Sequence, residues 1–430
     1  MAGASARQRR PSMWVLASIT LSGIMANTLL VPVIPDILEE FGQPDSAAGV
    51  LVAASPAPAI ALAPVLGILS DRYGRRSLLS PCLALFGAVG VLSAFAPSYG
   101  WLVAARFVQG LGSAGLSGIV LALISDHWQG ADRTRFIGYN SAVLTAGIAM
   151  LPPLGGLLAT LGGWRWSFAP YALGVVVAVV VWVQLPAHDR RAGGPTVRGQ
   201  LAAAASAVRQ PIVAAALGLG FVLFFLIFGL FLTVLPLLLE DSFGLDAGER
   251  GLVTVVPAVS STVAALLLAR LRVRLGARRV LWFGTATLAV AYVAVGAAPG
   301  LWLVLVASLA YGYAEGSTIP IIQDIVTSNT PPPSRGAVAT ALVGTFRAGQ
   351  TVGPLVVGAS LGLLTNSEVF LAGAAVIAVV TVVLVLWTPP AVVPEGGLED
   401  RPVAPGRAPA GGLAPDGAAG VTTSRARRRR

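Results

Sequence analysis

Long apolar segments alternate with short polar ones along almost the whole chain. A helix needs about 20 mainly apolar residues to cross a bilayer. Twelve segments of about this length can be read from the sequence, namely 13–35, 47–69, 78–96, 101–124, 136–159, 167–186, 211–238, 251–270, 280–298, 301–325, 336–362 and 368–388. These runs are longer than the alternating strands of an outer-membrane β-barrel. The pattern predicts an all-α membrane protein with 12 transmembrane helices.

One longer polar stretch divides this pattern near the middle. We therefore expect residues 13–186 and 211–388 to form two six-helix bundles, joined by a cytoplasmic central loop at 187–210. Residues 1–12 are expected to form a cytoplasmic N-terminus and 389–430 a disordered, basic cytoplasmic tail. The first apolar segment is too long to be a removable signal peptide, and it lacks a clear cleavage site. We therefore interpret it as a retained span.

Composition and charge support a membrane protein and orient it. Only 11% of the 430 residues are charged and 55% are hydrophobic, whereas soluble chains carry about 25% charged residues. All basic residues are arginines, and nearly all of them fall in the termini and in alternate loops. Because cytoplasmic loops carry the excess of basic residues, we expect both termini on the cytoplasmic side of a bacterial plasma membrane. The net charge of +10 is therefore an orientation signal and predicts no nucleic-acid partner. One cysteine and two histidines make a metal site improbable on composition.

The two halves of the chain resemble each other at an offset of 202 residues. At this offset Arg72, Gly74 and Arg76 align with Arg274, Gly276 and Arg278. Further matches join Pro97 to Pro299, Gly110 to Gly312, Arg133 to Arg335, Gly147 to Gly349, Pro152 to Pro354 and Gly156 to Gly358. Repeats of this kind are common in secondary transporters and place the substrate site at the interface of the halves. We therefore expect two pseudo-symmetric bundles.

A charged loop after the second segment carries the first family resemblance. It reads Gly67-Ile-Leu-Ser-Asp71-Arg72-Tyr-Gly74-Arg75-Arg76. This loop resembles the signature loop of the major facilitator superfamily, and the resemblance implies that fold and an alternating-access mechanism. It also implies a conformational latch between the halves, formed by Asp71, Arg72 and Arg75 together with Asp126. A plain positive-inside loop is the alternative, but it would not need an aspartate between the glycines.

Two further segments resemble motifs of the same superfamily. Arg106 in the fourth segment matches an arginine that the family associates with proton coupling, although it could instead extend to the near interface. In the fifth segment, a face of small residues and one proline resembles the motif of drug and metabolite exporters, and it comprises Gly138, Gly147, Pro152, Gly155 and Gly156. Leu151 stands where that motif has glycine. General small-residue helix packing is the alternative.

The interior offers few ionisable groups. Glu315 is the only carboxylate deep within a predicted span, and Arg347 could be its partner, either in proton or substrate handling or as a static pair. Asn27 lies at mid-depth in the first span, where related exporters often have an acid. Tyr311 and Tyr313 are candidates for the cavity wall, because each hydroxyl needs a partner.

These features predict a secondary active transporter that exports a small, mainly apolar compound in exchange for protons. A proton-coupled uptake symporter for a sugar, amino acid or organic acid is the alternative. A membrane enzyme or sensor is a remote one, because no HExxH or GxSxG motif is present. No ATP-binding loop or cofactor motif is found, so the expected partners of a monomeric protein are its substrate, protons and the bilayer.

Overall fold

The computed structural model describes residues 11–185, 209–330 and 335–387. The N-terminal residues 1–10, most of the predicted central loop and the predicted tail lie outside the described residues. The chain divides into two units, Met1–Leu386 and Trp387–Arg430, and the helices up to Leu386 all belong to the first. The following description concerns that unit.

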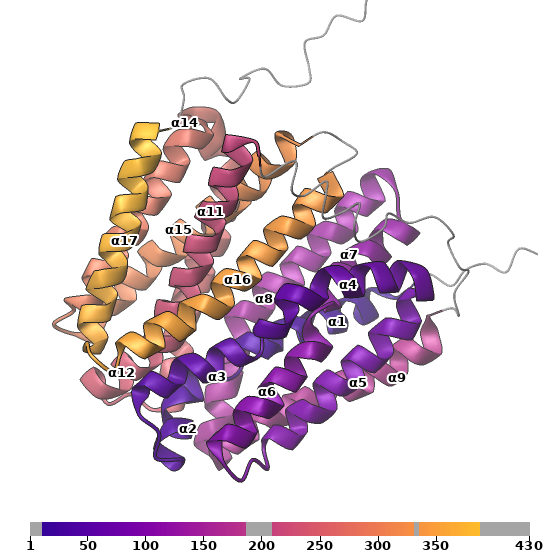
Figure 1. The fold of residues 1–430 in the computed structure, drawn as a ribbon, viewed down its shortest axis with the longest axis horizontal. Helices are drawn as coiled ribbons and strands as arrows, with labels where there is room; N and C mark the ends of the chain where they lie inside the picture. Colours follow the sequence, from indigo (N-terminus) through magenta and orange to yellow (C-terminus); the bar gives the residue numbers. More distant parts are fainter. Residues whose placement is uncertain (1–10, 186–208, 331–334, 388–430) are drawn as a thin grey trace, which may run out of the picture. The chain divides into compact units, whose positions relative to one another are not determined.

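Helices and short connections form the first half of this unit (Figure 1). Its elements, which include the 3-10 turns η1 to η3, are α1 (Met13–Thr28), η1 (Val31–Val33), α2 (Ile34–Glu40), η2 (Asp45–Ala47), α3 (Ala48–Ala54), α4 (Ala57–Tyr73), α5 (Arg75–Ser93), α6 (Tyr99–Ser113), α7 (Leu116–His127), α8 (Gly130–Gly162), η3 (Trp164–Tyr171) and α9 (Ala172–Gln184).

The second half is built in the same way. It comprises α11 (Pro211–Leu226), the π-helical segment η4 (Ile227–Val234), α12 (Leu235–Phe243), α13 (Ala247–Val253), α14 (Val255–Gly296), α15 (Leu301–Ser328), α16 (Arg335–Ser360) and α17 (Asn366–Trp387). The predicted all-α fold is thus confirmed for the described residues.

Nine helical stretches of the described chain are long and apolar enough to cross a membrane. One of them, Ala247–Gly296, contains two of the predicted spans. Every one of the twelve predicted segments contains helix, but α15 and α16 are not among the nine stretches, so the number twelve stays a prediction. The protein is a multi-pass membrane protein.

The sequence repeat is also visible in the backbone. Gly74 separates α4 from α5 with φ 94°, and Gly276 interrupts α14 with φ 78°. Both conformations favour glycine, since a Cβ atom is strained at positive φ. The two positions are related by the 202-residue offset, so α5 corresponds to the part of α14 that follows Gly276.

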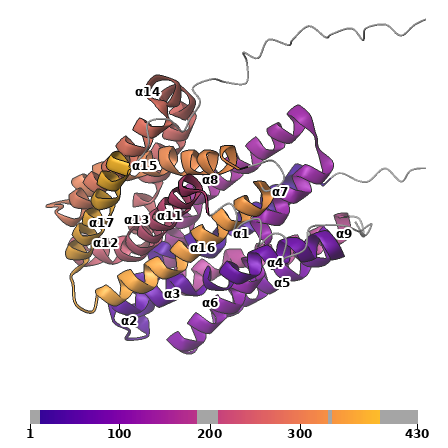
Figure 2. The ribbon, with the colours of Figure 1, turned by 45° about the horizontal axis from the view of Figure 1, so that its top comes forward.

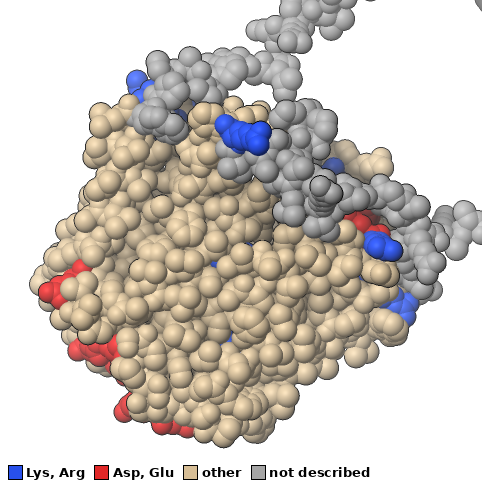
Figure 3. All heavy atoms as spheres, viewed as in Figure 1, with Lys and Arg blue, Asp and Glu red and all other residues tan. Residues whose placement is uncertain are grey.

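Charged side chains gather at the two ends of the helices (Figure 3). We call one end the arginine-rich face, defined by Arg72, Arg75, Arg76, Arg133, Arg135, Arg272, Arg274, Arg278, Arg279 and Arg335. We call the other the acidic face, defined by Asp36, Glu39, Glu40, Asp45, Glu240, Asp241, Asp246, Glu249 and Glu368. Between the two faces, the outward surface carries exposed apolar side chains such as Leu266 and Val290, which suit contact with lipid.

Candidate functional site: a polar interior between two charged faces

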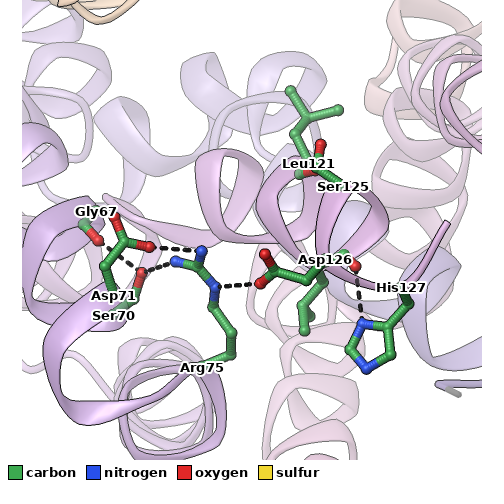
Figure 4. A network of polar contacts seen from close by, with 9 residues as sticks. Gly67, Ser70, Asp71, Arg75, Leu121, Ser125, Asp126 and His127 are labelled. Carbon is green, nitrogen blue, oxygen red and sulfur yellow. Dashed lines mark hydrogen bonds and ion pairs between the residues drawn. The ribbon is translucent and has the colours of Figure 1, made fainter. Parts of the chain in front are cut away.

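Three of the four predicted latch residues, Asp71, Arg75 and Asp126, meet at the arginine-rich face (Figure 4). The Arg75 guanidinium lies 2.5 Å from Asp71 and 3.1 Å from Asp126, and it also donates a hydrogen bond to the Ser70 hydroxyl. Ser70 in turn donates to the Gly67 carbonyl oxygen at 2.7 Å. Because Gly74 turns the chain between α4 and α5, Arg75 can reach back to α4 and across to α7.

This cluster joins three helices of the first half. Asp71, Arg75 and Asp126 come from α4, α5 and α7, and the described contacts of Arg75 stay within that half. Arg72 does not take part, since its guanidinium lies over the Tyr73 ring at 5.5 Å. The arrangement brings together three of the four predicted latch residues, while their role as a latch between halves stays a prediction.

Arg106 is buried inside the first half. Its side chain is 2% exposed, so it does not extend to the interface. The guanidinium donates to Gln109 at 2.5 Å, to the Tyr171 hydroxyl at 3.4 Å and to the Ala26 carbonyl oxygen. Its Nε atom has no hydrogen-bond partner, and no ion pair to Arg106 is found among the described residues. Arg106 therefore ties α6 to α1 while its charge is not neutralised.

A small cavity adjoins this arginine. Asn27 lines it together with Arg106, and apolar side chains complete the wall, namely Leu30, Val31, Ile34, Leu51 and Val52. Asn27 and Arg106 thus lie at one cavity, a pairing that their positions in the sequence did not predict.

Glu315 lies midway along α15 and is half-buried. No hydrogen bond or ion pair joins it to another described residue, and the pair with Arg347 does not form in this structure. Arg347 instead donates to Gln350 at 2.9 Å on its own helix, α16. The static Glu315–Arg347 pair is therefore absent, and the carboxylate is left without a cationic partner in the described chain.

The two candidate tyrosines differ in position. Tyr311 is 3% exposed and stacks on Phe231 with ring centroids 3.9 Å apart, so it belongs to the core of the second half. Tyr292 packs beside it with ring centroids 6.2 Å apart, and the Tyr292 hydroxyl has no hydrogen-bond partner in the described part of the chain. Tyr313 is half-buried. Tyr313 is thus the more exposed of the two, and the place of either tyrosine in a cavity wall stays a prediction.

The small-residue face of α8 packs in two directions. Gly147 contacts Leu21 and Ile24 of α1, and Gly155 approaches the Leu29 carbonyl oxygen. Leu151 is 5% exposed in the same core, so the leucine that departs from the exporter motif is accommodated. Gly138 borders open space. Gly156 approaches the Ala247 carbonyl oxygen of α13. The motif thus brings α8 against α1 and the turn that follows it on one side, and against α13 of the second half on the other.

Near the acidic face, α8 and α16 each cross a helix of the other half. Gly251 on α13 lies against the backbone of Pro152 on α8, and Gly49 on α3 lies against the backbone of Pro354 on α16. Both pairs are related by the 202-residue offset. A side chain at either glycine would collide with backbone atoms, so these crossings require glycine. Figure 2 shows α3 and α16 side by side.

An ion cluster at the acidic face also joins the halves. Arg250, at 2% exposure, contacts Asp36 of α2 and lies 3.1 Å from Glu240 of α12. A capping box starts α13, in which Asp246 and Glu249 exchange hydrogen bonds at 2.8 and 3.0 Å, and it fixes Arg250 in the first turn. We call Asp36, Glu240 and Arg250 the acidic-face triad.

This triad is not among the site residues predicted from the sequence. The signal that could have revealed it is an arginine, Arg250, that follows Glu240, Asp241, Asp246 and Glu249 within one short acidic stretch. The glycine crossings had a signal too, because Gly49 and Gly251 match at the repeat offset. Among the described residues, no group of three His, Cys, Asp or Glu side chains could hold a metal ion.

Comparisons with known proteins agree with this architecture. The chain is 34% identical over 163 residues to the bacillibactin exporter of Bacillus subtilis, which covers 36% of this chain and 40% of that protein. It is 29% identical over 339 residues to the class G tetracycline resistance protein of Vibrio anguillarum, covering 76% of this chain and 84% of that protein. The matched region thus spans less than half of the first relative and most of the second.

Solved structures share the fold at low sequence identity. One of them is a bacterial homologue of the human lysosomal transporter Spinster in an inward-facing and unoccupied conformation. It superimposes with a TM-score of 0.68 at 19% identity, and the match covers 89% of this chain and 96% of that one. A D-xylose–proton symporter superimposes with a TM-score of 0.70 at 17% identity, and the match covers 88% of this chain and 97% of that one. The sequence model of the Major Facilitator Superfamily matches residues 16–237 and 217–415. The chain therefore belongs to the Major Facilitator Superfamily and is a transporter, not an enzyme.

Proposed function

We propose that this transporter exports a small, mainly apolar compound in exchange for protons. The observation that carries the proposal is Glu315, a carboxylate midway along a helix without a cationic partner in the described chain. An isolated charge at this depth is costly, so the group is favoured in its neutral, protonated form when it is shielded from water. Exposure to either side of the membrane in turn would then let Glu315 take up and release a proton.

Relatives support export as the direction of transport. The similar proteins are named as a bacillibactin exporter and as tetracycline resistance proteins, and an exporter that removes an antibiotic would confer resistance. The cavity beside Asn27 and Arg106 is too small for a cargo in this structure, and its widening in another conformation would expose mainly apolar side chains, which favours a mainly apolar cargo over a sugar.

Alternating access assigns a role to the two charged faces. Both halves meet through the glycine crossings and the acidic-face triad, so this structure is closed at the acidic face. We propose that the arginine-rich face is cytoplasmic, following the positive-inside rule, and that both termini lie there in a bacterial plasma membrane. Reporter fusions at Gly42 and Ser242 should then signal outside the cell, and a cytoplasmic signal from either would contradict this orientation.

Inverted membrane vesicles test the coupling. An imposed pH gradient, acidic inside, should drive accumulation of tetracycline by the wild-type protein, if tetracycline is a cargo, and a panel of apolar compounds extends the search. Glu315→Gln fixes a neutral side chain, so the gradient should no longer drive accumulation, while exchange of cargo down its own gradient continues.

Asp324→Asn is the matched control. Asp324 lies on the same helix but at the arginine-rich face, where it pairs with Arg272 at 2.7 Å. This variant should retain proton-driven accumulation. Wild-type accumulation by Glu315→Gln would refute the assignment of the coupling proton to Glu315.

A further inference from the structure

Two arginines at equivalent positions of the repeat each lie against a tryptophan at the arginine-rich face. The Arg76 guanidinium lies 4.3 Å from the ring centroid of Trp182, and that of Arg278 lies 4.4 Å from Trp282. Trp182 comes from α9, whereas Trp282 comes from the same helix as Arg278. The two halves therefore build the same pair from different positions, so the repeat alone does not account for the tryptophans.

Each arginine also contacts the end of the last helix in its half. Arg76 donates to the Leu185 carbonyl oxygen at 3.3 Å, and Arg278 donates to the Val385 carbonyl oxygen at 3.2 Å. Helix C-termini leave carbonyl groups unpaired, so these bonds cap α9 and α17. They do not neutralise charge, because neither arginine has an ion pair in the described chain. The Nε atom of Arg278 has no hydrogen-bond partner among the described residues.

Both pairs lie on the periphery of the protein. Figures 1 and 2 place α5 with α9 and α14 with α17 at opposite edges of the helices, and Arg278 and Trp282 follow the break of α14 at Gly276. The neighbouring surface is apolar and exposed, with Val183 at 73% and Leu386 at 79%. Each arginine–tryptophan pair thus lies where the lipid-facing surface meets the charged face.

We propose that each pair binds the phosphate of an anionic phospholipid in the leaflet at the arginine-rich face. A guanidinium offers several N–H donors in a planar arrangement that suits phosphate oxygens. Tryptophan is favoured at the level of lipid headgroups, and basic pockets between helices on this side of a membrane protein bind anionic lipids. The acyl chains would lie along the apolar surface beside Val183 in one half and beside Leu386 in the other.

Lipid retention tests the proposal directly. The full-length protein is extracted from membranes containing phosphatidylglycerol and phosphatidylcholine, delipidated stepwise, and weighed by native mass spectrometry. The wild type should keep one phosphatidylglycerol per site after phosphatidylcholine is lost. The double variant Arg76→Gln with Arg278→Gln should keep neither of the two phosphatidylglycerol molecules. Added glycerol phosphate should not displace the lipid from the wild type, because a headgroup alone lacks the acyl contacts.

A matched control separates the sites from charge in general. Arg133 and Arg335 are also related by the repeat and lie on the same face, without a described tryptophan contact, so Arg133→Gln with Arg335→Gln removes equal charge and should keep both lipids. Equal lipid loss in the two double variants would overturn the proposal, as would retention by Arg76→Gln with Arg278→Gln.

A second variant guards against a folding defect. Trp282 also donates a hydrogen bond to the Leu384 carbonyl oxygen at the end of α17, so it is left intact. Trp182→Leu alone leaves the described cap of α9 and the charge of Arg76 in place. This variant should lose lipid at an earlier delipidation step than the wild type while its melting temperature in detergent stays unchanged. Wild-type retention of both lipids by Trp182→Leu would overturn the role of the tryptophan in the site.

Discussion

The acidic-face triad allows a quantitative prediction for Arg250→Gln. This change removes the cation that joins Asp36 of the first half to Glu240 of the second. The two carboxylates, both near other acids of the face, would then lie together without a counter-charge. The acidic face should therefore open more readily, because the closed state loses an attraction and gains a repulsion.

The burial of the three groups sets the size of the effect. Arg250 is 2% exposed, and the side chains of Asp36 and Glu240 are 38% and 37% exposed. Loss of a fully buried pair costs about 3–5 kcal/mol, and an exposed pair contributes below about 1 kcal/mol. An intermediate value of about 2 kcal/mol corresponds to roughly a thirtyfold shift in the ratio of open to closed molecules.

Cysteine accessibility measures this shift. The chain has one cysteine, so Cys82→Ser gives a cysteine-free background. Val31 lines the small cavity and is 5% exposed in the closed structure, which makes Val31→Cys a reporter of opening. A maleimide that cannot cross membranes should label it in intact cells at a rate up to about thirtyfold higher when Arg250→Gln is added. Ser242→Cys, at an exposed position, confirms that the reagent has access.

Arg165→Gln is the control for charge removal at this face. Arg165 pairs with Glu40 at 2.5 Å, and both residues belong to the first half. Its loss should leave the Val31→Cys labelling rate unchanged. Equal rates in the Arg165 and Arg250 variants, or no increase with Arg250→Gln, would show that the triad does not hold the halves together.

Two further predictions concern the glycine crossings and the arginine-rich face. Gly251→Val should prevent closure at the acidic face and reduce transport at least tenfold without loss of membrane insertion, whereas Gly138→Val, which adds its side chain into open space, should transport normally in the same vesicle assay. Asp71→Asn and Arg75→Gln should insert normally but transport slowly, because each breaks a contact of the charged cluster. Arg72→Gln should have the smaller effect, and equal transport rates in all three variants would reduce the loop to a topology signal.

The hydrophobic pattern predicted where helix lies, since every apolar segment contains helix, but it did not predict the breaks within segments. Within 101–124, for example, α6 ends at Ser113 and α7 begins at Leu116. The repeat offset likewise predicted Gly74 and Gly276, because a positive φ leaves a direct trace in the residue type. Side-chain partners were harder to predict. Glu315 and Arg347 were matched by charge alone, yet Arg347 bonds to Gln350 one turn away. Depth along a helix does not fix the direction in which a side chain points.

The symmetry of the scaffold and the asymmetry of its charges point to separate tasks. Equivalent glycine–proline crossings join the halves twice, so both halves can rock about matching contacts. The interior ionisable groups do not follow that symmetry, because Arg106 lies in the first half and Glu315 in the second, and neither has an ion pair in the described chain. A structure that only needed stability would gain from pairing or omitting such charges. We infer that the repeated contacts serve the movement, while the unmatched charges serve the exchange of cargo and proton.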